Sequence, residues 1–269
     1  MVEIFLENLL FISLGGCVGS FASMLIYRLP HPDTSINILS PRSFCPSCKT
    51  PLSLTQLIPF FGYLANKGEC SKCSKQIDGS YLFNEIFTAA LLIYLINLLG
   101  IINPLTWLIF SIAMILYVQA LMDFKTLLLS QPLSFLLILI GLVVNLGFEI
   151  FAVPLDALLG LLFGYGLLFS INMLYKMLRS QDGIGSGDFL LLSGIGSILG
   201  ASAIGPILLL GLKSNNLYIY DQQRSKDQRI TPGIWLGVWW NNIFINADDT
   251  KIEKGMNFLK KAWSNRQAD

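Results

Sequence analysis

Charged residues are scarce in this chain. Asp, Glu, Lys and Arg together make up 13% of its 269 residues, whereas a soluble domain usually contains about 25%. Hydrophobic residues make up 54%, and several uncharged runs are as long as the roughly 20 residues that a membrane-spanning helix needs. The net charge is only +1, so the charge balance gives no reason to expect a nucleic-acid partner. The composition predicts an integral membrane protein that crosses the bilayer several times.

Histidine is almost absent as well. His31 is the only histidine, and we interpret it as a solvated loop residue that follows Pro30. A Ser-His-Asp or Cys-His site needs a histidine beside its nucleophile, and an HExxH zinc site needs two. The chain therefore offers little for histidine-based hydrolysis. Carboxylates are left as the candidates for acid–base catalysis.

The uncharged runs place the expected spans. One long run is interrupted by Gly100-Ile-Ile-Asn-Pro104, which predicts two spans joined by a turn. A second interruption, GASAIGP at 200–206, predicts that another run divides into two short helices. We expect an all-α polytopic bundle of about six to eight transmembrane helices. The uncharged runs are 8–27, 86–122, 126–148, 157–175, 189–212 and the shorter 230–246.

Basic residues indicate the orientation of these spans. Six of them lie in 28–80, whereas the turns at 100–104 and 149–156 contain none. By the positive-inside rule, this alternation places 28–80, 123–130 and 176–188 in the cytoplasm and the N-terminus outside. The tail 247–269 is also basic, so the orientation of the last run stays open. The basic residues that support the prediction are Arg28, Arg42, Lys49, Lys67, Lys72, Lys75, Lys125, Lys176 and Arg179.

Four of the five cysteines form two CxxC motifs. Cys45 and Cys48 make the first, and Cys70 and Cys73 make the second. Two such motifs can gather four thiolates tetrahedrally around Zn²⁺, and a reducing cytoplasm argues against disulfides. We predict a structural zinc site; two redox pairs, or thiols without a metal, are the alternatives. Cys17 lies within the first span and is interpreted as a packing residue.

Two aspartates lie at the predicted membrane boundary. Asp123 ends one uncharged run and Asp188 precedes another. Two spans separate them, so both are expected on the cytoplasmic face. Carboxylates at the same depth can share a proton, with one acting as base on a water and the other as acid. Gly185 and Gly187 would permit a tight turn and the close approach of an extended peptide. The alternative is that both acids cap helices or pair with Lys125.

Two other acids are weaker candidates. Glu85 lies just before the second span and faces the cysteine insert, where it is expected either to cap the helix or to serve a cytoplasmic site. Asp156, in VPLDALLG, falls on the opposite face and is predicted to be the N-cap of the following span.

Five motifs occur in a fixed order along the chain. They are GSFASMLIYRLP at 19–30, the four-cysteine insert that ends in YLFNE, LDALLGLLFGYG, GIGSGDFLLL and, less closely, ITPGIWLG at 230–237. Together they resemble the type IV prepilin peptidases, the bifunctional leader peptidases and N-methyltransferases of type IV pilus and type II secretion systems. The resemblance covers about residues 15–237, which is most of the chain.

The resemblance implies an aspartic endopeptidase of the bacterial inner membrane. It would cleave the basic leader of prepilins or pseudopilins after a glycine, on the cytoplasmic side, and then methylate the new N-terminal amine with S-adenosylmethionine. The family's catalytic aspartates fall on Asp123 and Asp188, and its zinc-type cysteines fall on the two CxxC motifs. The methyltransferase role maps to the insert, where Glu85 is the first acid to test. The implied regions are 1–27 for the first transmembrane helix, 28–85 for the insert, 86–246 for the peptidase domain and 247–269 for a polar tail.

The chain departs from the family pattern at three places. Leu190 stands where the family has a lysine, 129–132 reads LSQP where the family has Leu-Pro-Asp, and Ser23 stands where it has asparagine. None of these changes removes a predicted catalytic carboxylate. The alternative function is a non-catalytic membrane scaffold of a pilus or secretion assembly, in which a zinc knuckle docks a partner.

Overall fold

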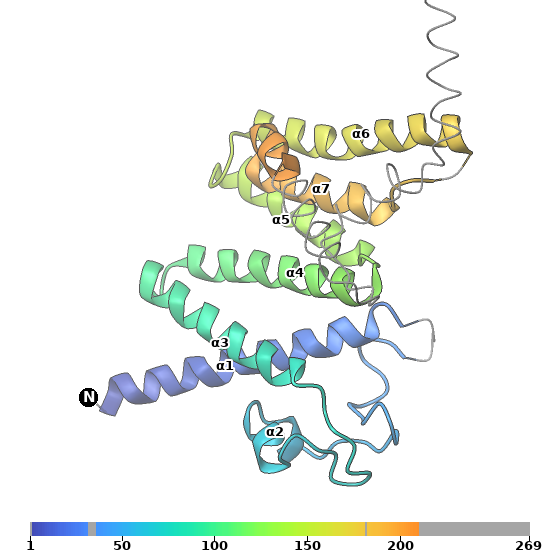
Figure 1. Ribbon diagram of the computed structural model, residues 1–269. Coiled ribbons are helices and arrows are strands. Elements are labelled where there is room, and N and C mark those ends of the chain that lie inside the picture. The colour runs from blue at the N-terminus through green and yellow to red at the C-terminus, as the bar shows by residue number, and fades with distance from the viewer. Residues whose placement is uncertain (1, 32–35, 181, 210–269) are drawn as a thin grey trace, which may run out of the picture. The chain divides into compact units, whose positions relative to one another are not determined.

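The computed structural model describes residues 2–31, 36–180 and 182–209 (Figure 1). The expected span 230–246, the ITPGIWLG motif and the tail 247–269 lie outside this part of the chain. The described residues are mostly helical and contain no β-strand, only two isolated bridges, Phe44–Pro51 and Glu69–Gln76. The all-α fold predicted from the sequence is confirmed. The chain divides into two compact units, Met1–Met122 with Leu128–Leu133, and Asp123–Leu127 with Ser134–Asp269.

Five helices of the described part are long and apolar enough to cross a membrane. The uncharged run 86–122 forms two of them, joined through Gly100, which has a φ of +86°, as the sequence predicts. The run 189–212 is also divided as predicted, because a helix ends at Leu199 before Gly200, where φ is +84°. The candidate spans are Asn8–Arg28 in α1 (Val2–Arg28), α3 (Ser80–Leu99), α4 (Pro104–Thr126), α5 (Gln131–Phe148) and α6 (Pro154–Arg179), followed by the shorter apolar α7 (Ser186–Leu199) and the 3-10 turn η2 (Ala201–Ala203).

In the first unit, α1 packs closely on α3. A Cβ atom at Gly15 would lie 2.5 Å from the Cα atom of Ala89, so only glycine permits this approach, as small residues do between transmembrane helices. The unit's core also includes the part of α4 from Phe110 to Met122. Its buried residues are Ala22, Ile26, Leu92, Leu95, Phe110, Met114, Val118 and Met122.

A buried chain of hydrogen bonds crosses this core. The Tyr117 hydroxyl donates to Asn84 Oδ1 over 2.7 Å, Asn84 Nδ2 donates to Ser23 Oγ over 2.8 Å, and Ser23 donates to the Gly19 carbonyl over 3.0 Å. Ser23, one of the departures from the family pattern, thus serves as both acceptor and donor. Buried polar groups inside a membrane need such partners.

The second unit is built on glycine contacts between α6 and α7. Gly160 and Gly196 bring the two backbones into contact, since a Cβ atom on either would collide with the carbonyl oxygen of the other. Asn145 of α5, which is fully buried, donates to the carbonyls of Ser197 and Ile198 over 2.8 Å each. These contacts fix the second half of α7 against its neighbours.

The prediction that Asp156 is an N-cap is wrong. The helix begins at Pro154, with Val153 as its N-cap, because proline is favoured at the first position of a helix. Asp156 lies in the first turn, and its Oδ1 accepts the Ala201 N–H over 3.2 Å. It caps the turn that follows α7 instead of its own helix.

Candidate functional site

The glycine loop before α7 is held by a side chain of α6. Asn172 accepts the backbone N–H groups of Gly183 and Ile184 over 2.8 and 3.0 Å, and its Nδ2 donates to Asp182 Oδ1 over 3.3 Å. Lys176 forms a salt bridge with Asp182 at 3.0 Å, and this cation, as hydrogen-bond donor and positive charge, lowers the pKa of Asp182. The Ile184 side chain is buried in the unit's core. The loop therefore enters α7 along a fixed path.

Asp188 lies at the third position of α7. The helix begins after Gly185, its N-cap, and the Asp188 carboxylate accepts the Gly185 N–H, as acids at this position of a capping box do. Gly185 has an ordinary φ of −68°, so it is not needed for an unusual turn. A Cβ atom there would lie 3.3 Å from Asp188 Oδ2. The bare backbone of Gly185 thus leaves room beside the half-buried carboxyl group.

Asp123 belongs to the second unit, as Asp188 does. It lies in the last turns of α4 and is only 4% exposed. Asp188 lies close enough for the negative charge of Asp123 to oppose its ionisation, after the larger effect of burial. The alternative of helix capping also holds for Asp188, because the same carboxylate caps α7. Two neighbouring carboxyl groups of this kind cannot both ionise cheaply.

The four insert cysteines form one cluster. Their Sγ atoms all lie within 4.8 Å of one another, with 4.0 Å between Cys45 and Cys73 and 3.9 Å between Cys48 and Cys70. A tetrahedral zinc site with Zn–S bonds of about 2.3 Å requires S···S edges of about 3.8 Å. The cluster therefore fits a metal ion of this kind.

The two halves of the cluster are built alike. In the first, the Cys45 N–H donates to the Thr50 carbonyl and the Lys49 N–H donates to the Cys45 carbonyl. In the second, the Cys70 N–H donates to the Lys75 carbonyl and the Ser74 N–H donates to the Cys70 carbonyl.

Hydrogen bonds in these turns favour the thiolate of two cysteines, whereas the pKa of Cys73 is raised to about 11, because burial and the neighbouring cysteines outweigh its hydrogen bond to the Lys75 backbone. The hydroxyl and backbone of Thr50 lower the pKa of Cys48 to about 6, and backbone N–H groups of Cys73 and Lys72 lower the pKa of Cys70. Thiolates are the metal-binding form of cysteine.

Comparison with known proteins decides the family. The Bacterial Peptidase A24 N-terminal domain model matches 13–98, and the Type IV leader peptidase family model matches 107–215. A prepilin leader peptidase/N-methyltransferase of Klebsiella pneumoniae is 34% identical over 207 residues, which cover 76% of this chain and 89% of that protein. The chain belongs to the type IV leader peptidase family.

Other relatives carry the same name. The protein of Pectobacterium carotovorum subsp. carotovorum is 29% identical over a match that covers 84% of this chain and 88% of that protein. The protein of Pseudomonas aeruginosa is 32% identical over a match that covers 73% of this chain and 78% of that protein. No solved structure matches the chain. Within this family of peptidases, the N-terminal match contains the cysteine cluster and the second match contains both Asp123 and Asp188.

Glu85 lies within the N-terminal family match, and its side chain is buried and hydrogen-bonded. Its Oε2 accepts the Phe60 N–H over 2.7 Å, and the carboxylate also accepts the Ser20 hydroxyl. It therefore ties the insert to α1 and α3 instead of capping its own helix. Whether it also takes part in methyl transfer stays a prediction.

Asn172 and the Glu85–Phe60 contact were not predicted from the sequence. A signal for Asn172 exists, because a lone amide in the apolar run 157–175 must find partners in a membrane. No sequence pattern marks Phe60 as the partner of Glu85, since the bond uses a backbone group.

Proposed function

We propose that this protein is a membrane aspartic endopeptidase that cleaves the leader peptide of type IV prepilins or pseudopilins and N-methylates the new N-terminal residue. The observation that supports the proposal is that Asp123 and Asp188 belong to one compact unit and that the charge of Asp123 reaches the Asp188 carboxyl group. Its relatives are named for the same two activities.

Asp123 and Asp188 are the proposed catalytic pair. At working pH one carboxyl group is protonated and the other is ionised, because their charges repel. The ionised group takes a proton from a water molecule, whose oxygen attacks the carbonyl carbon of the scissile peptide bond. The protonated group donates its proton to the leaving amide nitrogen, so the C–N bond breaks and the pair is left with one shared proton.

The residues around Asp188 hold this pair in place. Asn172 fixes the glycine loop, and the N–H of Gly185 orients the Asp188 carboxylate. The absent side chain of Gly185 leaves space in which the peptide backbone of a leader can approach. Gly187 is proposed to serve the same purpose two residues further along.

The four insert cysteines are proposed to hold a structural Zn²⁺. Their spacing matches a tetrahedral site, and four protein thiolates leave no position for a reacting water. Zinc bound there contributes folding free energy to a segment too small for a large core. It takes no part in cleavage.

Methyl transfer is proposed from the names of the relatives and requires S-adenosylmethionine as the methyl donor. Glu85 is the one acid proposed for methyl transfer, and its carboxylate already accepts two hydrogen bonds from the protein. We therefore propose no chemical step of methyl transfer for it. The protein is proposed to lie in the bacterial inner membrane, with the insert and the aspartate pair toward the cytoplasm. That orientation rests on the distribution of basic residues.

A cleavage assay in membranes tests the proposal. Membranes with wild-type protein, Asp123→Ala or Asp188→Ala are incubated with a prepilin, and the product mass reports leader removal and methylation together. The expected result is a processed product only with the wild type. The scaffold alternative predicts full activity in assembly for both aspartate variants and loss of it when Cys45 or Cys70 is replaced. Asp78→Asn, an exposed acid outside the pair, is the control and should process normally.

A further inference from the structure

The insert contains an uncharged segment with exposed apolar side chains. No charged residue lies between Lys49 and Lys67, and this stretch includes η1 (Thr55–Leu57) and α2 (Phe61–Ala65). Large exposed apolar areas mark interaction sites. The exposed side chains and their exposed fractions are Leu54 at 72%, Ile58 at 50%, Phe61 at 57% and Leu64 at 63%.

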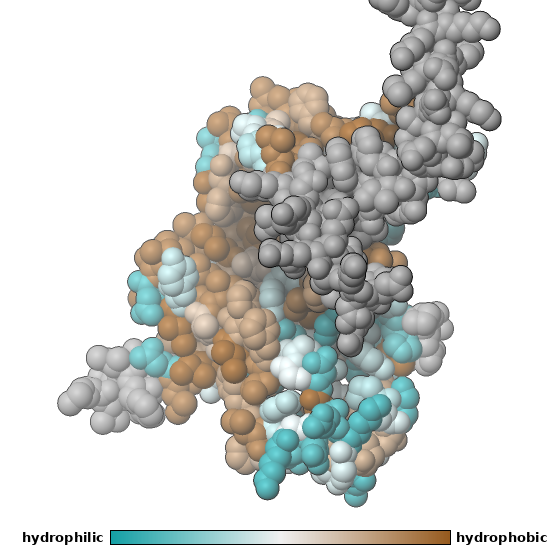
Figure 2. Space-filling view, in the orientation of Figure 1, coloured by the Kyte–Doolittle hydropathy of each residue, from teal (hydrophilic) through white to brown (hydrophobic). Residues whose placement is uncertain are grey.

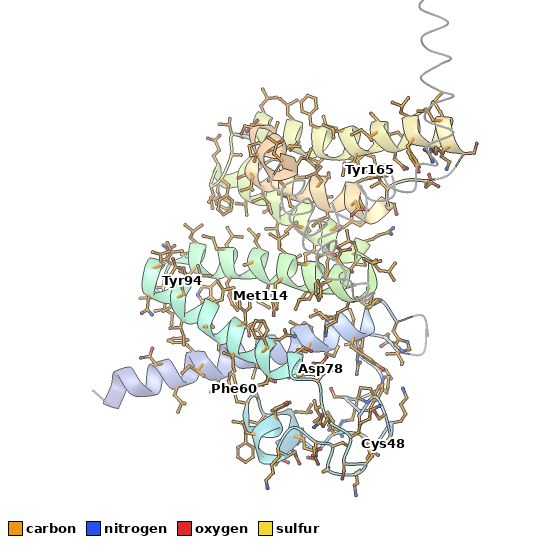
Figure 3. All side chains as sticks on the ribbon, viewed as in Figure 1. Cys48, Phe60, Asp78, Tyr94, Met114 and Tyr165 are labelled. Carbon is orange, nitrogen blue, oxygen red and sulfur yellow. The ribbon has the colours of Figure 1, made fainter. Side chains whose placement is uncertain are left out.

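This segment is fixed against membrane-spanning helices. The Phe60 N–H donates to Glu85 of α3 over 2.7 Å. Pro59 and Phe60 also pack on Gly16 of α1, where an added Cβ atom would lie 2.9 Å from Pro59 Cβ and 2.6 Å from Phe60 Cε2. Figure 3 labels Phe60 where the insert approaches these helices. A glycine in the span thus leaves room for the aromatic ring of the insert.

The two contact points lie well inside the spans. Gly16 precedes Arg28, the end of its span, by 12 residues, or about 18 Å along a helix that rises 1.5 Å per residue. Glu85 follows Ser80, the start of α3, by five residues, or about 8 Å. The hydrocarbon core is about 30 Å thick. Contacts at these levels bring the segment to the edge of the hydrocarbon or within it.

The exposed apolar side chains continue the apolar surface of the candidate spans, which lipid is expected to cover. On the spans beside the segment, Phe21 is 51% exposed, Phe83 60% and Ile86 52%. Figure 2 shows hydrophobic residues over the long helices and hydrophilic residues gathered over the insert around the place where Figure 3 labels Cys48. The insert therefore has a polar part at its cysteines and an apolar part beside the spans.

We propose that the segment 54–64 is inserted into the leaflet on the insert's side of the membrane, with its exposed apolar side chains against lipid acyl chains. Lys49 and Lys67, which bracket the segment, then lie at the level of the anionic headgroups, where basic residues are attracted. The insert is thus anchored in the membrane. The sequence predicted instead that the insert, 28–85, lies wholly in the cytoplasm. The proposal concerns membrane contact alone and is independent of leader cleavage.

Labelling from within the bilayer tests this proposal. The full-length protein is reconstituted in phosphatidylglycerol-containing vesicles with a lipid that carries a diazirine on its acyl chain, irradiated, digested with trypsin and mapped by mass spectrometry. The peptide 50–67 should carry several-fold more label than the neighbouring cysteine peptides 43–49 and 68–72. Labelling of 50–67 no higher than that of 43–49, with α1 and α3 well labelled, would overturn the proposal.

Paired variants separate contact with lipid from a general change in the protein. Phe61→Asp with Leu64→Asp should reduce the label on 50–67 to the level of the cysteine peptides, whereas Leu39→Asp, at a 93% exposed insert residue outside the segment, should leave it unchanged. Zinc content measured in parallel shows that the insert is still folded. A segment that is unlabelled by lipid and crosslinks only to added prepilin would show a peptide occupant instead, and would also overturn the proposal.

Discussion

Asn172 and Asp182 are joined by a hydrogen bond of 3.3 Å from Nδ2 to Oδ1, which links the last third of α6 to the start of the glycine loop. The same asparagine accepts two backbone N–H groups of that loop. A single side chain thus sets the path by which the chain reaches Asp188.

Replacement of Asn172 by alanine should loosen this loop. Two backbone N–H groups lose their acceptor, at a cost of about 1–3 kcal/mol for a buried unsatisfied group. We expect a lower midpoint of thermal unfolding in detergent and a fall in the leader-cleavage rate of at least tenfold. Lys176→Ala removes only an exposed ion pair and should change both quantities little. Equal effects of the two variants would contradict the role given to Asn172.

Gly185→Ala should impair cleavage with little loss of stability. The added methyl group would lie 3.3 Å from Asp188 Oδ2, close enough to displace the carboxylate by a few tenths of an ångström. Gly166→Ala is the matched control, because nothing lies within 4 Å of a Cβ atom there, and alanine gains roughly 0.5–1 kcal/mol over glycine in a helix. Cleavage rates measured side by side should fall only for Gly185→Ala; an unchanged rate would show that the space beside Asp188 is not used.

Gly160→Ala should separate α6 from α7. Its methyl group collides with the carbonyl oxygen of Gly196, a backbone atom that cannot rotate away. We expect much less folded protein after purification in detergent, measured by size-exclusion chromatography, and Gly166→Ala again serves as the control. Normal yield and thermal stability of Gly160→Ala would contradict the close contact between the two helices.

Metal analysis should find one zinc ion per chain. Cys48→Ser removes one of four ligands and should reduce the bound zinc measured by plasma mass spectrometry, along with protease resistance of the insert. Cys17→Ser lies outside the cluster and should retain the wild-type zinc content. A wild-type protein that contains no zinc after purification without chelators would contradict the metal site.

The helices and the cysteine cluster were predictable from the sequence. Long uncharged runs can only be helical in a bilayer, and the turn at Gly100 and the break at Gly200 follow from glycine and proline. The even number of spans between Asp123 and Asp188 predicts that both lie on one face. Paired CxxC motifs predicted the cysteine cluster.

Contacts made through the backbone were not predictable. The Glu85 carboxylate could have capped its own helix, but its partner is the N–H of Phe60, 25 residues away in sequence. Asp156 was misassigned because Pro154 starts the helix two residues earlier. Gly185 was expected to permit a tight turn and the close approach of a peptide, but its φ of −68° requires no glycine, so only the second role stays a prediction. Such details depend on which backbone atoms tertiary packing brings together.

The cleavage kinetics of Asp123→Asn, Asp188→Asn and the double variant test the central claim most directly. Two carboxyl groups that act as one unit give non-additive losses, so each single variant should lose nearly all cleavage of a prepilin leader and the double variant should be no slower than either single variant. Retention of the wild-type rate by either single variant, with the protein folded and in the membrane, would contradict the proposed aspartate pair.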